Sequence, residues 1–353
     1  MSKQSRIYLI NEKYSDNLGD NAISACLSAL VSRLVLNEVI EIDFSFRTET
    51  KVLNHNSIIR KKLKIKILQR AYFLAKNFRK VLAIKAREND IGIIGGGQLI
   101  QDNTTFPIST FLFCMYFWLV GAKIIFFGVG CGRRFGWFSF ALYWISLRCA
   151  CRILVRDSTS KAILSEKFGI EAHLVPDVVY SFKVRRKNSD NNRSLIAPIN
   201  YEVFHRYSDE SPYQFTNKQD YIAFWIRTVK ERYNSKQELK LFATTKRDLE
   251  FCHEIYENLP TNIRKTCEVL NFETWVDVCG YATENDIVIA GRMHALILFQ
   301  LCGATILPFN VSSKIVTYEQ EYMSKDVDEL REELCAIAND ILSSQPFIIT
   351  AKR

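Results

Sequence analysis

An arginine and a histidine two positions apart are the residues of this sequence best placed to do chemistry. Gly291, Arg292 and His294 follow an apolar stretch, 287–289, and open an apolar helical stretch that ends at 301. A strand that turns into a helix at this point would put a fixed cation and a titratable imidazole beside a helix N-terminus, which attracts anions. A lone arginine or histidine is usually structural, but this pairing indicates an anion site with a proton donor attached.

Two glycine-rich stretches follow predicted strands. The first comprises Gly95, Gly96 and Gly97, and the second contains Gly128 and Gly130 and leads to Arg133. Glycine lets a backbone approach a ligand closely and leaves N–H groups open to an anion. Neither stretch matches a known nucleotide-binding motif. Tight strand-to-helix turns and a solvated arginine are the alternative interpretation.

Carboxylates follow other strands in the same way. Asp20 ends the stretch Asn17, Leu18, Gly19, Asp20, and this stretch either starts a helix or lines a ligand-binding cleft. Asp102 follows the first glycine stretch, and Asp177 follows the strand 172–175. Each could act as an acid or base, but aspartate and asparagine are also preferred helix caps. Arg156 ends the strand 152–155, where it could face a ligand or pair with the next residue.

The composition bounds the kind of protein that carries these groups. The chain has 353 residues, of which 48% are hydrophobic and 24% charged, and its formal net charge is +9. A positive net charge favours binding to acidic partners such as phosphate-bearing ligands or an anionic membrane. The chain lacks a basic terminal arm and zinc-finger spacing, so nucleic acid is not an expected partner. The ten cysteines form no CxxC pair, which predicts reduced thiols and no metal site.

Apolar runs alternate with helical patterns along the chain, which predicts parallel sheets covered by helices. The predicted strands are 6–10, 39–46, 91–94, 123–128, 152–155, 172–175, 195–199, 239–243, 267–270, 287–289 and 305–308. The predicted helices are 21–36, 60–87, 107–120, 137–149, 158–168, 218–233, 246–258, 273–282, 293–302 and 325–343. The apolar segment 108–130 is nearly long enough to span a membrane, but a Gly-Ala-Lys interruption favours a buried helix, a turn and a strand.

A polar break at 185–194 predicts two α/β domains, 1–184 and 195–353, with that break as the linker. The last helix could pack back on the first domain. Two consecutive parallel-sheet, Rossmann-like domains facing across a cleft form a glycosyltransferase-B-like architecture. Ligands of such sheets bind beyond the carboxyl ends of the strands, where all the candidate residues lie.

The ordered motifs NLGD, GGGQLIQD, GVGCG, VRDS, VPD and GRMHA resemble the polysaccharide pyruvyl transferase family over about residues 7–320. Three positions differ from the family pattern. Gly291 and Met293 stand where the family usually has Ser and Leu, and Arg133 stands where it often has Pro. The lysine that the family carries after its last strand corresponds to Lys314, at an irregular spacing.

The resemblance implies phosphoenolpyruvate as donor and a sugar of a bacterial surface polysaccharide, or of its lipid-linked precursor, as acceptor. The product is a pyruvate ketal that bridges two hydroxyls. That donor carries a phosphate and a carboxylate and so requires cations; the candidates are Arg292, Arg156, Arg133 and Lys314, with Gly291 in the same turn as Arg292. His294 is the expected acid, and Asp20, Asp102 or Asp177 the expected base. Neither cofactor nor metal is expected.

Two other functions fit parts of the sequence. A nucleotide-sugar-dependent glycosyltransferase would also need arginines and glycine turns, and the stabilising donor would distinguish it. A non-catalytic, membrane-associated scaffold would explain only the basic segment 60–87.

That segment carries eleven Lys and Arg residues and no acidic residue. Its apolar residues at helical spacing are predicted to cover the sheet, with the lysines pointing outward; they are Leu63, Ile67, Ala71, Leu74, Phe78 and Leu82. Such a patch would bring a cytoplasmic enzyme to the inner face of the membrane. The N-terminus shows no signal-peptide pattern.

Overall fold

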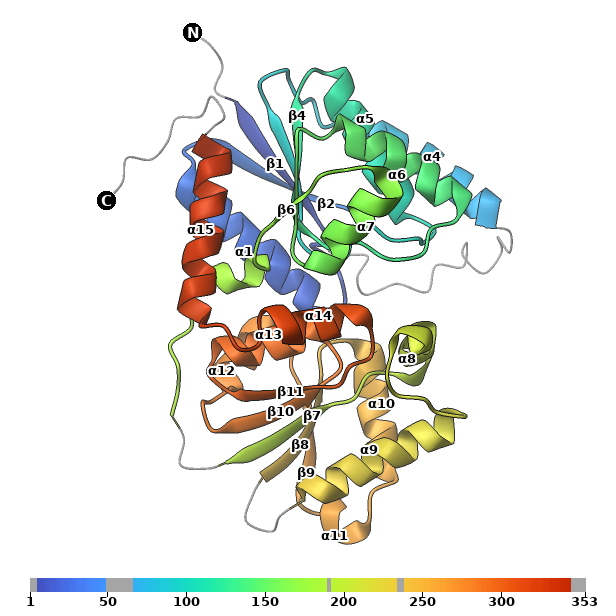
Figure 1. The fold of residues 1–353 in the computed structure, drawn as a ribbon, viewed down its shortest axis with the longest axis vertical. Coiled ribbons are helices and arrows are strands. Elements are labelled where there is room, and N and C mark those ends of the chain that lie inside the picture. Colours follow the sequence, from blue (N-terminus) through green and yellow to red (C-terminus); the bar gives the residue numbers. More distant parts are fainter. Residues whose placement is uncertain (1–4, 49–65, 189–191, 234–237, 344–353) are drawn as a thin grey trace. The chain divides into compact units, whose positions relative to one another are not determined.

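The computed structural model describes residues 5–48, 66–188, 192–233 and 238–343 (Figure 1). The chain forms two compact units. The first comprises Met1–Ser15, Ile23–Ser181 and Leu330–Arg353, and the second comprises Asp16–Ala22 and Phe182–Glu329. Helix α1 (Leu18–Leu34) therefore begins in the second unit and continues in the first, and the last helix, α15 (Val327–Ser343), does the same.

The first unit is built on a six-stranded sheet in the order β2-β1-β3-β4-β5-β6. Every neighbouring pair is parallel. The strands are β1 (Arg6–Asn11), β2 (Glu38–Asp43), β3 (Ile91–Gly95), β4 (Lys123–Val129), β5 (Arg152–Val155) and β6 (His173–Leu174). β1, β3 and β4 are buried along almost their whole length, as strands covered on both faces must be.

The connecting elements of this unit, besides α1 and α15, are α4 (Lys66–Leu82), α5 (Phe106–Leu119), α6 (Trp137–Cys149), α7 (Ser158–Phe168) and the 3-10 turn η1 (Val178–Ser181). α5 is the most apolar of these helices, and its aromatic side chains enter the core. Phe113 and Phe117 are fully buried there, and Phe117 meets Tyr8 of β1 edge to face at 5.5 Å. This aromatic packing fixes α5 on the sheet.

The second unit has a five-stranded parallel sheet in the order β11-β10-β7-β8-β9. Its strands are β7 (Arg193–Ala197), β8 (Glu238–Ala243), β9 (Cys267–Asn271), β10 (Asp286–Ala290) and β11 (Thr305–Pro308). Its helical elements are α8 (Tyr201–Arg206), η2 (Ser208–Glu210), α9 (Lys218–Arg232), α10 (Lys246–Glu257), α11 (Thr261–Arg264), α12 (Trp275–Tyr281), α13 (Met293–Leu301) and α14 (Ser313–Glu321).

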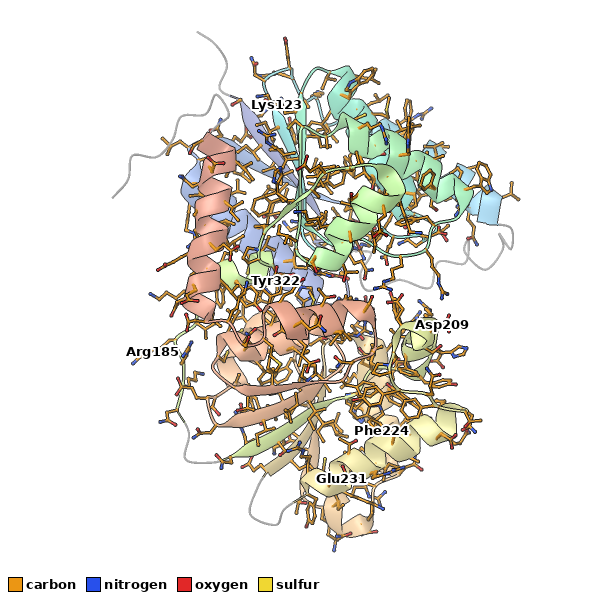
Figure 2. The ribbon with its side chains drawn as sticks, viewed as in Figure 1. Lys123, Arg185, Asp209, Phe224, Glu231 and Tyr322 are labelled. Carbon is orange, nitrogen blue, oxygen red and sulfur yellow. The ribbon has the colours of Figure 1, made fainter. Side chains whose placement is uncertain are left out.

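An aromatic cluster packs α9 against the loops that follow β7 and β11. Phe309 directly follows β11 and meets Trp225 at 4.8 Å and Phe224 at 5.3 Å; Phe224 is labelled in Figure 2. Tyr221 of α9 donates a hydrogen bond from its hydroxyl to the carbonyl of Ile199, at 2.8 Å. The loops at the carboxyl edge of this sheet are therefore held by buried packing, which keeps their polar side chains in place.

The predicted fold class is confirmed, since both halves are parallel α/β sheets. The apolar segment 108–130 divides into α5 and β4, as predicted. No helix in the described ranges is long and apolar enough to cross a membrane. Three helices were not predicted from the sequence: α8, α11 and α14. The first two are short, and α14 carries too few apolar residues for a clear helical pattern.

The prediction for segment 60–87 was wrong in one respect. α4 begins at Lys66, and the predicted positions 60 to 65 lie outside the described residues. Leu74, Phe78 and Leu82 do not cover the sheet but are exposed by 41%, 52% and 54%. The inward positions lie one residue earlier along the helix and consist of half-buried Phe73 and buried Asn77 and Val81. Both stripes are largely apolar, so periodicity could not choose between them. The stripe residues Leu63 and Ile67 are not described, and Ala71 is exposed.

Candidate functional site

The carboxyl edge of the second sheet gathers most of the candidate side chains. β10 ends at Ala290 and leads through Gly291 to Arg292, while β8 leads to Thr244 and β7 to Asn200. Gly291 is needed for close packing. A Cβ built on it would lie 3.0 Å from Val311, whose loop follows β11. Parallel strands end at one edge, so four loops converge there.

Arg292 is locked in a two-point ion pair. Its Nε donates to Oδ2 of Asp248 at 2.7 Å and its Nη2 to Oδ1 at 3.2 Å. Asp248 is 1% exposed, and its Oδ1 also accepts from the backbone N–H of Asn200 at 2.9 Å. A guanidinium has five N–H groups, and this pair uses two of them. Arg292 is 25% exposed, so the pair orients it without enclosing it.

The surroundings of Arg292 favour its charged form. Burial acts to lower the pKa of the guanidinium, but the carboxylates of Asp248 and Asp20 and the ring of Tyr207 raise it above its usual value. Asp20 belongs to the predicted NLGD stretch. Its charge therefore acts on the arginine of the predicted Arg-x-His turn, within the second unit.

The NLGD stretch packs directly against His294. A Cβ built on Gly19 would lie 2.6 Å from Cβ and 2.8 Å from Nδ1 of His294, so only glycine fits. The backbone N–H of Leu18 donates to the carbonyl of Thr244 at 2.9 Å, and that of Gly19 to Oδ1 of Asn17 at 3.1 Å. The stretch opens α1 and also packs on His294.

Two helices begin at this edge without a capping bond from the N-cap residue itself, although the carboxylate of Glu210 accepts from the N–H and the hydroxyl of Ser313 in the first turn of α14. Arg292 is the N-cap of α13 and Ser312 the N-cap of α14, and neither side chain makes a capping hydrogen bond. Ser312 is 2% exposed, and its Oγ has no hydrogen-bond partner within the described residues. First-turn N–H groups that no side chain caps, as at the start of α13, can bind an anion.

Lys314 and Tyr207 complete this edge. Nζ of Lys314 lies 5.7 Å from the centre of the Tyr207 ring. Burial raises the pKa of the Tyr207 hydroxyl, and the charge of Arg292 opposes that rise. Tyr207 is thus close to two of the four candidate donor-binding cations, Arg292 and Lys314. The second unit therefore brings together Asn17, Gly19, Asp20, Gly291, Arg292, His294 and Lys314.

Arg156 and Asp177 form a separate pair in the first unit. Nη1 of Arg156 lies 3.1 Å from Oδ2 of Asp177, and both residues are 4% exposed. Asp177 also accepts from the N–H of Val179 at 3.1 Å. A Cβ built on Gly130 would lie 3.2 Å from Nη2 of Arg156, so this glycine packs on the guanidinium. Asp157 caps α7 by accepting from Ser160.

The first glycine stretch serves close packing in the first unit. Gly96 has φ +66°, and a Cβ built on it would lie 1.9 Å from Cγ2 of Ile23 in α1. A Cβ on Gly95 would lie 2.1 Å from Leu27. The N–H of Gly130 donates to the carbonyl of Gly97 at 2.8 Å, which ties the two glycine loops together. Packing and backbone conformation therefore explain these glycines without a ligand. Gly128, with φ +67°, packs on Val178 in the same way.

Asp102 holds the start of α6. Its carboxylate accepts from the N–H of Gly136 at 2.8 Å and from the hydroxyl of Ser139, and Arg70 lies 3.9 Å away. These contacts give Asp102 a helix-capping role. Arg133 is exposed.

The residues after β7 and β8 were not predicted to belong to this edge. Thr244, Thr245 and Asp248 follow a predicted strand directly, and Asp248 accepts the ion pair of Arg292. The Thr-x-x-Asp spacing is a helix-start signal, and Thr245 does cap α10. Because the spacing is explained by a helix start, it did not indicate that Asp248 also pairs with Arg292.

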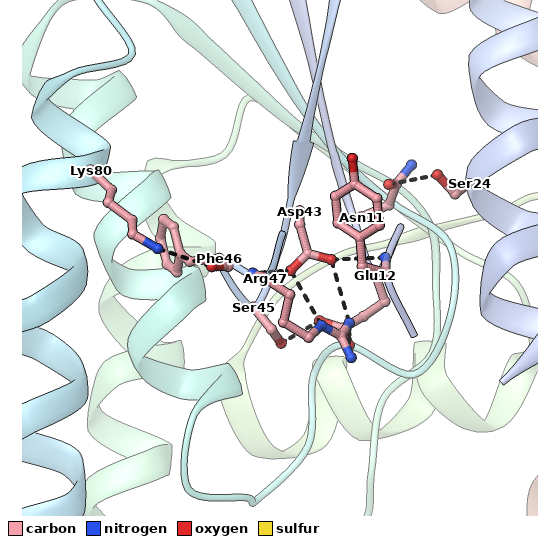
Figure 3. Close-up of polar contacts among 9 residues, drawn as sticks. Asn11, Glu12, Ser24, Asp43, Ser45, Phe46, Arg47 and Lys80 are labelled. Carbon is pink, nitrogen blue, oxygen red and sulfur yellow. Dashed lines mark hydrogen bonds and ion pairs between the residues drawn. The ribbon is translucent and has the colours of Figure 1, made fainter. Parts of the chain in front are cut away.

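A polar network at the carboxyl ends of β1 and β2 was also missed (Figure 3). Asp43 accepts from the N–H of Arg47 at 2.7 Å, and the guanidinium of Arg47 also contacts Glu12. Asn11 accepts from the hydroxyl of Ser24 at 2.9 Å. These bonds fix the loop that leads from β1 toward the NLGD stretch. Over the described ranges, no group of three or more His, Cys, Asp or Glu residues could hold a metal ion.

Comparisons with known proteins identify the family and the fold. The family model described as polysaccharide pyruvyl transferase matches residues 17–312. The chain matches none of the curated proteins with which it was compared.

Among solved structures, the fold is similar to that of a putative UDP-N-acetylglucosamine 2-epimerase from Listeria monocytogenes, with a TM-score of 0.53, 12% identity, and 99% of this chain and 100% of that chain covered. It is also similar to the UDP-GlcNAc 2-epimerase of Methanocaldococcus jannaschii in complex with UDP-GlcNAc and UDP, with a TM-score of 0.52, 10% identity, and 97% and 99% coverage. At these identities the likeness shows the glycosyltransferase-B-like fold alone.

Proposed function

This chain belongs to the polysaccharide pyruvyl transferase family, and from that premise we propose that it forms a pyruvate ketal on a sugar, with phosphoenolpyruvate as donor. The observation that carries the proposal is the Arg-x-His turn at an uncapped helix start, with the NLGD stretch packed against its histidine. Both motifs fall within the matched residues.

The donor carries a phosphate and a carboxylate, and the edge of the second sheet offers matching groups. Arg292 presents the N–H groups that its pair with Asp248 leaves over, and the start of α13 presents backbone N–H groups. Lys314 supplies a second cation. We assign donor binding to these groups, with Arg156 as a further candidate in the first unit.

We assign the proton transfer to His294. In the proposed reaction, an acid gives a proton to the methylene carbon of the enol, which makes C2 electrophilic. A sugar hydroxyl then forms a bond to C2 and loses its proton to a base. The C2–O bond to phosphate breaks, phosphate leaves, and a second hydroxyl of the sugar closes the ketal with loss of its proton. General acid catalysis of this kind contributes about 10²–10⁴-fold to a rate.

Asp20 is the base that the contacts favour among the three candidates. Its carboxylate is close enough to Arg292 to raise the pKa of the guanidinium. Asp177 is buried against Arg156, and Asp102 caps α6. Both of these carboxylates have structural roles that compete with proton transfer.

The proposed acceptor is a sugar of a bacterial surface polysaccharide or of its lipid-linked precursor. A lipid-linked acceptor would hold the enzyme at the cytoplasmic face of the membrane. The basic segment 60–87 would add electrostatic attraction to anionic lipids. Residues 60–65 of that segment lie outside the described part of the chain.

A direct test separates this function from a nucleotide-sugar-dependent glycosyltransferase of the same fold. The melting temperature of the purified protein is measured with phosphoenolpyruvate, with inorganic phosphate and with UDP. Stabilisation by phosphoenolpyruvate well above that by phosphate supports the proposal, because a ligand that binds the folded state raises stability by mass action. Stabilisation by UDP alone would overturn it. Mass spectrometry of the surface glycan with and without the gene then tests for a gain of pyruvate minus one water.

A further inference from the structure

Large apolar side chains gather on three helices of the first unit. Ten of the thirteen large hydrophobic side chains that are exposed within the described ranges lie on α4, α5 and α6. They are Leu68, Tyr72, Leu74, Phe78 and Leu82 of α4, Trp118 and Leu119 of α5, and Trp137, Trp144 and Ile145 of α6. Trp137 is 84% exposed and Leu119 is 70% exposed. We call this set the aromatic face.

The three helices are neighbours. α5 packs on β4 and contacts both α4 and α6, and Figure 1 shows the three grouped on one side of the first sheet. Arg70 of α4 lies over the ring of Phe138 of α6, at 4.4 Å, which brings the starts of these two helices together. A patch built from several elements in this way is larger than the scattered exposed apolar residues of an ordinary surface.

The charge on these helices has a single sign. Together α4, α5 and α6 contain six basic residues and no acidic residue; the basic residues are Lys66, Arg70, Lys76, Arg79, Lys80 and Arg148. The guanidinium of Arg148 lies 3.8 Å above the Trp144 ring, and Nζ of Lys76 lies 5.6 Å from the Tyr72 ring. The cations are thus interleaved with the aromatic rings. At the border, Asp102 is paired with Arg70, and Glu88 lies beside Gly121.

We infer that the aromatic face inserts into the interfacial layer of an anionic lipid bilayer. Tryptophan and tyrosine favour the headgroup level of a membrane, where an apolar ring and a polar group are both accommodated. Long basic side chains reach anionic headgroups while their stems stay in the apolar layer. None of the described helices can cross a membrane, so the face lies on the bilayer and does not span it.

A second copy of the chain is a poorer occupant of the same face. Most two-fold dimers pair a surface with itself, which would bring two sets of the same six cations together with no acidic residue on these helices to balance them. An anionic bilayer supplies the missing charge and accepts the apolar side chains at once. Charge complementarity therefore selects the membrane.

The inference rests on the membrane part of the proposed function and extends it from electrostatic attraction to insertion. It does not depend on the donor chemistry, because the groups assigned to the donor in the second unit take no part in it. The experiments can therefore contradict the donor-binding proposal without contradicting the membrane inference, and the reverse.

The first experiment measures binding of the whole protein to vesicles of phosphatidylcholine and to an equimolar mixture of phosphatidylcholine and phosphatidylglycerol. The tryptophan emission is followed, and brominated lipids serve as depth-sensitive quenchers. We expect binding to the anionic vesicles, a blue shift of the emission and quenching from within the bilayer. If the protein binds neither type of vesicle, the inference is wrong. Salt-sensitive binding without a blue shift of the emission or quenching by the brominated lipids would also overturn it, because that result indicates charge attraction alone.

Matched variants assign the effect to the face. Lys76→Glu with Arg79→Glu should weaken binding to anionic vesicles at least about tenfold. Arg227→Glu with Lys230→Glu, the same exposed spacing on α9 of the second unit, should leave it unchanged. Leu74→Ser with Phe78→Ser should abolish the quenching, whereas Leu36→Ser with Val276→Ser, which are also exposed, should not. Equal effects of test and control pairs would overturn the assignment.

Two further measurements test donor binding and the oligomeric state. Stabilisation by phosphoenolpyruvate should be the same in the Leu74→Ser, Phe78→Ser variant as in the unaltered protein, which shows that the variant is folded and that the donor site is separate. Sedimentation measures the oligomeric state without lipid. A dimer that the same double substitution dissociates would assign the face to a second copy and overturn the membrane inference.

Discussion

Arg292 and Asp248 form a two-point ion pair whose carboxylate is 1% exposed. Asp248 also accepts a hydrogen bond from the backbone of Asn200, so it links the loop after β7 to the loop after β10. The pair fixes the direction of the guanidinium while neutralising part of its charge. Asp248 is thus a positioning residue for the proposed donor-binding arginine.

Asp248→Ala should destabilise the protein and weaken donor binding together. Removing one partner of a fully buried ion pair costs about 3–5 kcal/mol, and we expect a smaller loss here because Arg292 is 25% exposed. Arg292 then loses its fixed direction, so we expect a raised KM for phosphoenolpyruvate in an assay run below the melting transition.

Strand β10, which leads to Arg292, supplies a matched control for the Asp248→Ala variant. Asp286 at the start of β10 is 0% exposed and pairs with Arg193 at 2.7 Å, at the opposite end of the strand from Arg292. Asp286→Ala should lower the free energy of unfolding to a similar extent but leave the KM unchanged. If both variants change the KM alike, the effect of Asp248 is one of general stability.

His294→Gln should lower turnover about 10²–10⁴-fold if the imidazole is the general acid. Glutamine keeps a polar side chain of similar size at the start of α13, so the fold should persist. Stabilisation by phosphoenolpyruvate in a melting experiment should also persist. Near-normal kcat at saturating donor would remove His294 from the acid role.

Gly19→Ala should abolish activity through its contact with the same histidine. The added Cβ would lie 2.6 Å from Cβ of His294, an atom close to the backbone that cannot swing away. The first turn of α1 or the start of α13 must therefore shift. Gly280→Ala is the matched control, because nothing lies within 4 Å of its Cβ direction and alanine is the better helix residue. Activity of Gly19→Ala equal to that of the control would show that this contact is unimportant.

Gly96→Val should reduce stability, and any loss of activity should follow from that. The left-handed conformation costs a non-glycine residue about 1–2 kcal/mol, and overpacking against Ile23 costs about 1–3 kcal/mol more. Denaturant unfolding measures the sum. If the Gly96→Val protein has normal stability but does not bind phosphoenolpyruvate, this turn takes part in donor binding.

The sequence predicted the strands and most helices because buried strands and helical periodicity are local signals. It could not predict the partner of Arg292, since Asp248 lies 44 residues away and its spacing resembles a simple helix cap. It also could not orient α4, where two adjacent stripes are both apolar and only tertiary packing selects Phe73 and Val81 as the inward set.

A glycine-rich motif alone does not separate packing from ligand binding. The glycines at 95–97 looked suited to a ligand, but the methyl groups of Ile23 and Leu27 fill the space that a side chain would need. A glycine-rich motif indicates that another group lies close to the backbone. Only the fold shows whether that group is a ligand or a packed side chain. The Arg-x-His turn was more informative, because its position after a strand already implied a helix N-terminus.

Ser312→Ala gives the sharpest test of the proposed anion site. An N-cap serine that makes its capping bond costs about 1 kcal/mol when it is replaced by alanine. Ser312 makes no such bond, and its buried Oγ has no hydrogen-bond partner in the described part of the chain. Its removal should therefore leave the free energy of unfolding unchanged or slightly higher, since an unsatisfied buried polar group is lost.

The same substitution should weaken stabilisation by phosphoenolpyruvate and by inorganic phosphate, because it removes the Ser312 hydroxyl, which we propose as a hydrogen-bond donor to the bound anion. Ser109→Ala is the control: its Oγ is likewise buried without a partner among the described residues, but it lies on α5 of the first unit. That variant should affect neither quantity. Loss of stability with unchanged phosphate binding in Ser312→Ala would make the hydroxyl an ordinary helix cap and would move the phosphate-binding group to the start of α13.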